Sequence, residues 1–242
     1  MDHTAEQTYG KRIADVYDDL YQSYDERAIT LLAELAGSGR ALELGIGTGR
    51  IALPLKARGV EVCGIDNSPL MVEKLRAKPG GDVIPVTLGS FADVAMAGEF
   101  SLIYVMFITF FDLLTQVEQV RGCANAASQL SPGGAFLIEA FVPDMTRYQG
   151  GQSLRTISVG TDVVRLDAAL LDPVNQRITG QHISIGEHGV RLYPIELRYA
   201  YPAELDLMAR LAGLRLRQRW GDWARGDFSA DSGKHVSVYE RV

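Results

Sequence analysis

The chain has 242 residues, of which 47 % are hydrophobic and 22 % are charged, and its formal net charge is −6 at pH 7. This composition predicts a globular protein with a sizeable core, and it excludes a sequence-independent nucleic-acid binder, because neutralising phosphates needs a dense Lys/Arg surface. No apolar run is long enough to span a bilayer, and the N-terminus lacks the apolar region of a signal peptide. Cys63 and Cys123 have no C-x-x-C spacing, which indicates free thiols. We therefore expect a cytoplasmic protein that binds neither nucleic acid nor membrane.

Periodic patterns divide the first 149 residues into alternating elements. Apolar residues at helical spacing over residues 10–36 predict an N-terminal helical cap, residues 1–36, built of two short helices. Strand-like runs then alternate with helical patterns; the strands are expected at 41–44, 60–65, 83–88, 102–105 and 135–140, and the helices at 49–57, 69–77 and 113–130. This alternation predicts parallel βαβ units, and the continuous apolar strands indicate a sheet covered on both faces.

The pattern changes at about residue 150. Four strands follow without intervening helices, at 156–159, 163–170, 176–187 and 190–199, with a tight turn at 187–189, and they predict an antiparallel insertion over residues 150–201. A helix at 202–212 and strands at 214–220 and 235–240 end the chain. We therefore predict an α/β fold: a doubly wound, mostly parallel seven-stranded sheet with an antiparallel β insertion after the fifth strand. Residues 37–149 and 202–242 would form its cofactor-binding core.

The segment "ALELGIGTGR" ends the first strand in a glycine loop. Gly45, Gly47 and Gly49 leave backbone amides bare where a helix begins, so a ligand can approach closely. A dinucleotide-binding G-x-G-x-x-G would need glycine at Arg50, and the Gly-Lys-Ser/Thr of a P-loop is absent. Glu43 precedes the loop and would suit a ligand that carries positive charge.

The second strand ends in Asp66, 21 residues after Gly45. A carboxylate at this position can accept hydrogen bonds from both hydroxyls of a ribose. Asn67 or Ser68 can cap the helix that begins at Pro69. Together, the glycine loop and Asp66 predict a site for a nucleoside that carries a small charged group.

In this order, Glu43, the three glycines and Asp66 resemble the signature of the class I S-adenosylmethionine-dependent methyltransferases, and the resemblance covers about residues 9 to 141. It implies S-adenosylmethionine as the cofactor, with the methionine part at the glycine loop and the ribose at Asp66. The family usually has Gly-Asp and an apolar residue after the third strand, the Asp reaching the adenine. This chain departs from that pattern with Ser90 and Phe91, so its adenine contact is less well defined.

Two further segments extend the expected site. After the fourth strand, Met106 and Phe107 stand where the family makes apolar contacts to the cofactor, although core packing explains them equally well. The segment "ADVYDDLY" resembles one in the branch that methylates amino groups of nucleotide-linked deoxysugars. That branch implies that Tyr21 contacts the cofactor, with Tyr17 beside it. The complete set of expected cofactor residues is Tyr21, Glu43, Gly45, Gly47, Gly49, Asp66, Asn67, Ser90, Phe91 and Met106.

The acceptor site is less defined by the sequence. Methyl transfer is an in-line displacement, and it needs a base only when the acceptor arrives protonated. His235 is the first candidate for that base if the last strand runs antiparallel, as in this family, and Glu139 could meet the acceptor or steer an amine. Both also fit purely structural roles. Tyr17, Phe107 and Trp223 are candidate acceptor contacts, and Trp223 fits packing at a strand end equally well.

The remaining histidines and the insertion leave alternatives open. His182 and His188 are interpreted as solvated positions and His3 as part of a tail, and no residue spacing indicates a metal site. The insertion could form a lid over the acceptor or an interface with a second copy, so a homodimer is one alternative.

The first functional hypothesis is methyl transfer to a small molecule of secondary metabolism, with amino sugar N-methylation as the first specific case. O-, N- or S-acceptors in peptide or polyketide products remain alternatives. So does an RNA or protein methyltransferase, although the acidic charge weighs against RNA. A non-catalytic regulatory protein that binds S-adenosylmethionine is the alternative from another class, and only the departure at Ser90 favours it.

Overall fold

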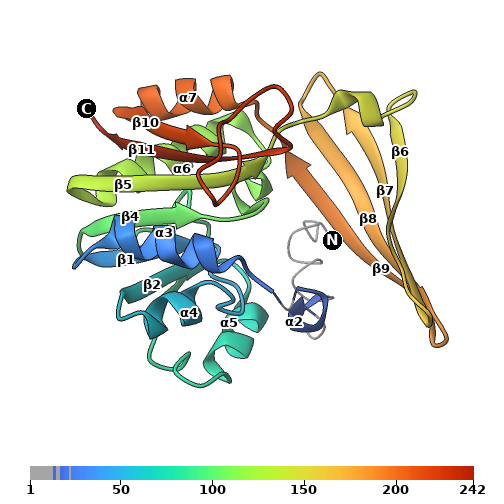
Figure 1. The fold of residues 1–242 in the computed structure, drawn as a ribbon, viewed down its shortest axis with the longest axis horizontal. Helices are drawn as coiled ribbons and strands as arrows, with labels where there is room; N and C mark the ends of the chain where they lie inside the picture. Colours follow the sequence, from blue (N-terminus) through green and yellow to red (C-terminus); the bar gives the residue numbers. More distant parts are fainter. Residues whose placement is uncertain (1–12, 15–16, 22) are drawn as a thin grey trace.

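The chain folds around two separate β-sheets (Figure 1). The computed structural model describes residues 13–14, 17–21 and 23–242. The larger sheet contains β1 (Arg40–Leu44), β2 (Glu61–Asp66), β3 (Val86–Leu88), β4 (Phe100–Val105), β5 (Leu130–Phe141), β10 (Leu214–Trp220) and β11 (Lys234–Arg241). These seven strands lie in the order β10-β11-β5-β4-β1-β2-β3. Strands β1 to β5 pair in parallel, whereas β11 runs antiparallel to β5 and β10. The predicted seven-stranded, mostly parallel sheet is confirmed.

Helices cover both faces of this sheet, which explains why its strands are continuous apolar runs. The helices are α2 (Tyr17–Leu20), α3 (Glu26–Ala36), α4 (Ala52–Ala57), α5 (Pro69–Arg76), α6 (Gln116–Gln129) and α7 (Pro202–Leu211), with 3-10 turns η1 (Thr109–Asp112) and η2 (Met145–Arg147). Buried side chains of α6 and α7 join one hydrophobic cluster, and those of α3, α4 and α5 join the other. Among the described helices, none combines the length and the apolar character that a bilayer-crossing segment requires.

The second sheet is the predicted antiparallel insertion. It contains β6 (Gln152–Val159), β7 (Val163–Asp172), β8 (Arg177–Gly186) and β9 (Gly189–Arg198), in the order β6-β7-β8-β9. All its pairings are antiparallel. The register pairs Gly186 with Gly189, so Glu187 and His188 form the tight turn that the sequence predicts.

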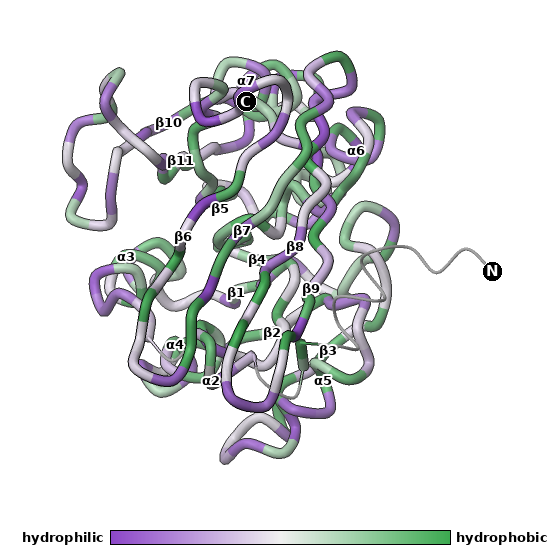
Figure 2. Tube along the Cα trace, turned by 90° about the vertical axis from the view of Figure 1, so that its right-hand side faces the viewer, coloured by the Kyte–Doolittle hydropathy of each residue, from purple (hydrophilic) through white to green (hydrophobic). Residues whose placement is uncertain are grey.

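The two faces of the second sheet have different surroundings. Ile178, Tyr193 and Leu197 share one face and are buried, and two of them belong to the hydrophobic cluster of α6 and α7; this is the inner face. Side chains on the opposite, outer face, such as Leu154 and Leu192, are exposed. Figure 2 looks onto the outer face, and α2 lies behind it, between the second sheet and the carboxyl ends of the parallel strands. The inner face is therefore turned toward the edge at which ligands bind in parallel α/β sheets.

A buried ionic network fixes the end of β9 to the helical layer. Arg198 is 5 % exposed, and its guanidinium donates to Gln119 Oε1 at 2.5 Å and to Glu204 Oε1 at 2.7 Å. Gln119 in turn donates to the carbonyl of Arg198 at 2.8 Å. Burial raises the pKa of Glu204, but the hydrogen bonds from Arg198, Gln176 and Gln116 together outweigh this effect and the net shift is downward. The network therefore joins β9 to both α6 and α7.

Replacing this guanidinium tests the importance of the junction. We expect Arg198→Ala to lower the free energy of unfolding by about 3–5 kcal/mol, because it leaves the Glu204 carboxylate without its cation. Urea denaturation measures the loss. Arg215→Ala removes an exposed pair with Glu240 and should cost less than about 1 kcal/mol. Equal losses in the two variants would contradict a special role for Arg198.

Candidate functional site

The glycine loop between β1 and α4 contains backbone that only glycine adopts readily. Gly45 has φ 75° and Gly47 has φ 54°, both in the left-handed region. A Cβ on Gly45 would lie 2.2 Å from Thr109 Cγ2, so this glycine is required by packing. A Cβ on Gly47 would meet its nearest atom, Met71 Cε, only at 3.5 Å. The loop therefore leaves room beside Gly47 for the close approach of a ligand.

Asp66 ends β2 beside this loop. It is 8 % exposed, and its carboxylate accepts hydrogen bonds from Gly47 N at 2.7 Å and from Ser68 N at 2.8 Å. Burial raises the pKa of the carboxyl, and the two amide bonds oppose this effect. A carboxylate has about four lone-pair sites, so two more hydrogen bonds can be accepted. The structure thus joins Asp66 to the glycine loop and leaves its carboxylate able to accept from further donors.

Glu43 lies on β1 beneath the loop and is almost completely buried. Burial raises its pKa to about 8, although Tyr104 donates a hydroxyl hydrogen bond to its Oε2 at 3.0 Å. At pH 7 the side chain is therefore mostly protonated. A cationic ligand nearby would favour the ionised form, so Glu43 can adjust its charge to the ligand.

Three aromatic rings surround a guanidinium at the end of the glycine loop. The Arg50 guanidinium carbon lies 3.8 Å from the ring centroid of Phe107, 5.4 Å from that of Tyr21 and 5.7 Å from that of Tyr17. Burial raises the pKa of Tyr17 to about 12, so its hydroxyl stays protonated. Arg50 Nε is buried and has no hydrogen-bond partner among the described residues. In the sequence, Arg50 only excludes a dinucleotide motif, and no local pattern predicts its position among the three rings.

Helix α2 is tied to the glycine loop by charge. Thr48 Oγ1 donates to Asp18 Oδ1 at 2.7 Å, and Lys78 Nζ lies 2.7 Å from Asp18 Oδ2. Lys78 also donates to the carbonyl of Thr48 at 2.8 Å. Burial alone would raise the pKa of Asp18, but these donors lower it. The contact holds Tyr17 and Tyr21 next to the loop, and the sequence analysis did not include Asp18 or Lys78.

Glu139 is the centre of a buried network rather than an exposed carboxylate. It accepts hydrogen bonds from Phe107 N at 3.2 Å, Trp223 Nε1 at 2.9 Å and Lys234 Nζ at 3.0 Å. Phe107 itself has φ 60°, a strained value for a bulky residue. Glu139 and Trp223 are thus brought together, but Glu139 orients Phe107 and the final loop instead of presenting a free oxygen to an acceptor.

Several expected cofactor residues lie away from the open part of the site. Phe91 and Met106 are buried in the two hydrophobic clusters, and the ring of Phe91 stacks on Phe110 with centroids 6.5 Å apart. The expectation that Phe91 packs on adenine therefore does not fit the structure, because that ring fills the core. Ser90 Oγ accepts a hydrogen bond from Ala92 N at 3.2 Å, and the side chain of Asn67 is exposed.

His235 does not have the surroundings of a base that meets an acceptor. It is completely buried, on the same side of the sheet as Arg219 and Asp206, and its Nδ1 lies 2.8 Å from Ser237 Oγ. Burial, supported by the charge of Arg219, lowers the pKa of His235 to about 4. The expectation of a base at this position is corrected: His235 is a neutral core histidine.

His182 is less solvated than the sequence predicts. This histidine is only partly exposed, and its Nδ1 is hydrogen-bonded to Asp167 on the neighbouring strand. His188, in the turn between β8 and β9, is exposed as expected. In the described ranges, no group of three or more His, Cys, Asp or Glu side chains could hold a metal ion.

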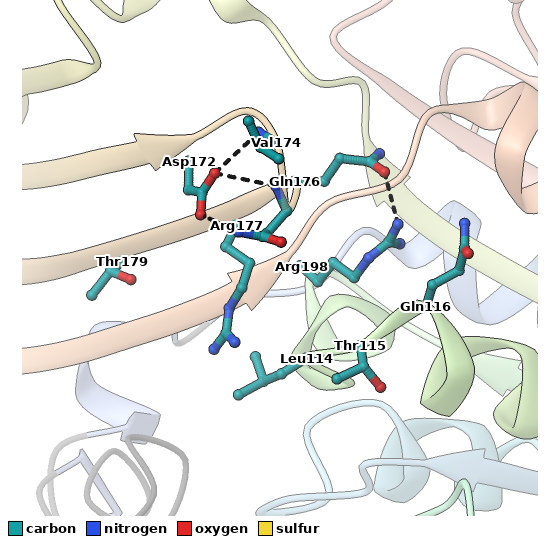
Figure 3. Close-up of a pocket in the computed structure, with 10 residues that line it drawn as sticks. Leu114, Thr115, Gln116, Asp172, Val174, Gln176, Arg177, Thr179 and Arg198 are labelled. Carbon is teal, nitrogen blue, oxygen red and sulfur yellow. Dashed lines mark hydrogen bonds between the residues drawn. The ribbon is translucent and has the colours of Figure 1, made fainter.

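A cavity of about 840 Å³ lies elsewhere, where the second sheet meets the start of α6 (Figure 3). Its lining includes Thr115, Thr179 and the two arginines Arg177 and Arg198. Each arginine is already paired with a glutamate, Arg177 with Glu196 and Arg198 with Glu204. No residue of the glycine loop lines this cavity, so its size does not make it the cofactor site.

The burial of His235 makes a prediction about stability. The folded pKa of about 4 lies below the ordinary value of 6.5, so the unfolded chain binds the proton first as the pH falls. Between pH 6.5 and 4 the wild type should therefore lose about 3 kcal/mol relative to His235→Gln, which lacks this titration. Chemical denaturation of both proteins at several pH values measures the difference; a difference that stays constant with pH would contradict it.

Comparisons with known proteins agree with this geometry. The family described as a methyltransferase domain matches residues 41–134, which contain the glycine loop and Asp66. The chain is 27 % identical, over 201 residues, to the cypemycin N-terminal methyltransferase of a Streptomyces species, a match that covers 83 % of this chain and 82 % of that protein. It is 19 % identical to CalS10, an amino pentose methyltransferase from Micromonospora echinaspora solved with S-adenosylmethionine bound; the TM-score is 0.71 over 94 % of this chain and 97 % of the other, a likeness of fold.

The structure of the CcbJ methyltransferase from Streptomyces caelestis gives a stronger match. It is 41 % identical to this chain, with a TM-score of 0.90, and the match covers 98 % of this chain and 99 % of that protein. Identity at this level over nearly the whole length of both proteins shows a common family, not only a common fold. The chain belongs to the S-adenosylmethionine-dependent methyltransferases.

Proposed function

We propose that this enzyme transfers a methyl group from S-adenosylmethionine to an amine nitrogen of a small natural product. The observation that carries this proposal is the group of three rings, Tyr17, Tyr21 and Phe107, whose faces already lie against the positive charge of Arg50. Aromatic faces stabilise positive charge. When a neutral amine is methylated, positive charge passes from the sulfonium to the nitrogen, so such rings fit both the start and the end of the reaction.

The residues around the glycine loop fit the cofactor. The space beside Gly47 would admit the methionine part, and the remaining lone pairs of Asp66 would accept the ribose hydroxyls. The Arg50 guanidinium would offer charge-assisted hydrogen bonds to the methionine carboxylate. S-adenosylmethionine supplies the activated methyl group; the protein holds the acceptor in line with it and excludes water.

The relatives support nitrogen as the accepting atom. They include an N-terminal methyltransferase for cypemycin and a sugar N-methyltransferase, KedS8. An amino sugar therefore remains the first specific acceptor in the proposal. Methyl transfer to an O- or S-acceptor from a peptide or polyketide pathway is the alternative reaction. A non-catalytic protein that binds the cofactor is the alternative class of function.

A matched panel of acceptors separates these possibilities. We expect the enzyme to methylate a methyl amino-deoxyglycoside, an alanyl peptide amide or prolinamide, and not their hydroxyl or thiol counterparts. Release of S-adenosylhomocysteine and the mass of the methylated product measure the reaction. Turnover of only the hydroxyl or thiol compounds would contradict nitrogen transfer, whereas cofactor binding without any turnover would favour the non-catalytic class.

Asp66 gives a separate test of the cofactor site. Asp66→Ala should weaken S-adenosylmethionine binding at least about tenfold, because each lost charge-assisted hydrogen bond contributes about 1.5–3 kcal/mol. Calorimetric titration measures the affinity. Asp82→Ala, at an exposed carboxylate, should leave the affinity unchanged, and circular dichroism should show that both variants are folded. Unchanged affinity in folded Asp66→Ala would remove this residue from the site.

The compartment and the oligomeric state remain proposals as well. Cys63 and Cys123 are both free and buried, which supports action in a reducing cytoplasm. The homodimer considered from the sequence stays a prediction.

A further inference from the structure

Four polar side chains form a row across the inner face of the second sheet. The strand register pairs Arg155 with Asp167, Asp167 with His182, and His182 with Tyr193. Side chains of directly paired residues lie on the same face of a sheet. The row therefore shares its face with Leu197, which is buried against the body of the protein.

This row is turned toward the ligand edge of the parallel sheet. Tyr148, in the segment that follows β5, is close enough for the charges of Arg155 and Asp167 to act on its pKa, which burial raises. Strand β9, which carries Tyr193, contacts η1. Thr109 of η1 is the residue that a Cβ on Gly45 would strike. Figure 1 shows α2 on the side of the second sheet that the inner face borders.

The hydrogen bonds of the row define one protonation state of His182. Its Nδ1 lies against Asp167 Oδ1, while Arg155 Nη2 holds Asp167 Oδ2 at 3.2 Å. Burial would raise the pKa of Asp167, whose side chain is 17 % exposed, but His182 and Arg155 lower it. The carboxylate is therefore ionised and accepts from Nδ1–H. This leaves the Nε2 lone pair of His182 free to take a proton, since the described residues offer it no partner, and the side chain is 31 % exposed.

Methylation of an amine needs such a group. In neutral water an aliphatic amine is mostly an ammonium ion, which has no lone pair and must lose a proton before it attacks. The catalytic candidates from the sequence do not supply this group, since His235 is completely buried and both carboxylate oxygens of Glu139 already accept hydrogen bonds. His188 lies on the exposed hairpin turn. Among the histidines of the described chain, His182 alone combines an ionised partner with partial exposure on the inner face.

We propose that His182, oriented by Asp167, is the general base that deprotonates the acceptor ammonium, and that the inner face of the second sheet forms the acceptor site. This inference rests on the proposed N-methyl transfer. The ammonium proton passes to Nε2, and Asp167 stabilises the imidazolium that forms. The freed lone pair then forms the N–C bond while the C–S bond breaks with its electrons remaining on sulfur. The imidazolium finally returns its proton to water.

The charges that face His182 act in opposite directions. On its own row stand Asp167, Arg155 and Tyr193, and the next row of the register places Arg165 and Arg191 on the same face, on either side of Ser184. Tyr148 faces the row from the segment after β5. Charged groups of both signs therefore face His182, and Asp167 is hydrogen-bonded to its ring.

The test uses the full-length protein, S-adenosylmethionine and whichever amine of the panel is turned over fastest. At pH 7, His182→Gln should lower kcat about 10²-fold or more, with little change in KM or in cofactor affinity. Asp167→Asn should lower kcat about tenfold or more, because an amide nitrogen facing Nδ1 favours the wrong tautomer. His188→Gln, on the exposed turn, is the matched control and should retain full activity.

A pH profile separates catalysis from a structural role. As the pH rises toward the pKa of the amine, more acceptor arrives already neutral, so the deficit of His182→Gln should shrink about tenfold per pH unit. A deficit that is independent of pH, or kcat equal to that of the wild type at pH 7, would overturn the inference. A wild type that binds the cofactor but methylates no amine would instead overturn the proposed function, and the inference with it.

Nitrogen-15 NMR of the imidazole gives an independent measurement without an acceptor. We expect the neutral His182 ring to carry its proton on Nδ1, and a proton on Nε2 would overturn the assignment. The same spectra of Asp167→Asn should show the loss of this preference.

Discussion

The hydrogen bond from Gly47 N to the Asp66 carboxylate joins the ends of two neighbouring parallel strands. It determines the path of the glycine loop, because the loop must leave β1 and return its backbone amide to the tip of β2. The positive φ angles and the tight contact of Gly45 with Thr109 follow from this path. The residues that could hold a nucleoside are thus preorganised by backbone geometry, before any ligand contributes binding energy.

Around this constraint the protein assembles the remaining site from distant segments. Asp18 brings α2 to the loop, and Glu139 holds Phe107 and Trp223 in fixed positions. These contacts converge on one edge of the sheet because the carboxyl ends of all its parallel strands meet there. The second sheet faces the same edge through its inner side, which carries the row that contains His182 and Asp167.

The ionisable groups of the protein divide into two kinds. Glu43 and His235 are buried and shift toward their neutral forms, which avoids the large cost of an uncompensated buried charge. Arg198 and Asp167 keep their charges because each has a partner of opposite sign within hydrogen-bonding distance. Groups of the second kind can orient another side chain by charge, and Glu43, beneath the glycine loop, is placed to gain a charge when a cation binds.

The sequence by itself determined the fold class, the antiparallel insertion, the glycine loop and the position of Asp66, since each depends on periodicity or on residues close together in the chain. The tertiary structure decided which side chains meet: the core position of Phe91, the burial of His235, the rings around Arg50 and the pairing of His182 with Asp167. Phe91 and Arg50 lie in loops outside the strands, so distant segments decide their packing. For His235 and His182 the physical reason is the face of the strand that each residue occupies and the register between strands. A shift of one residue would reverse both, and local sequence does not fix that register.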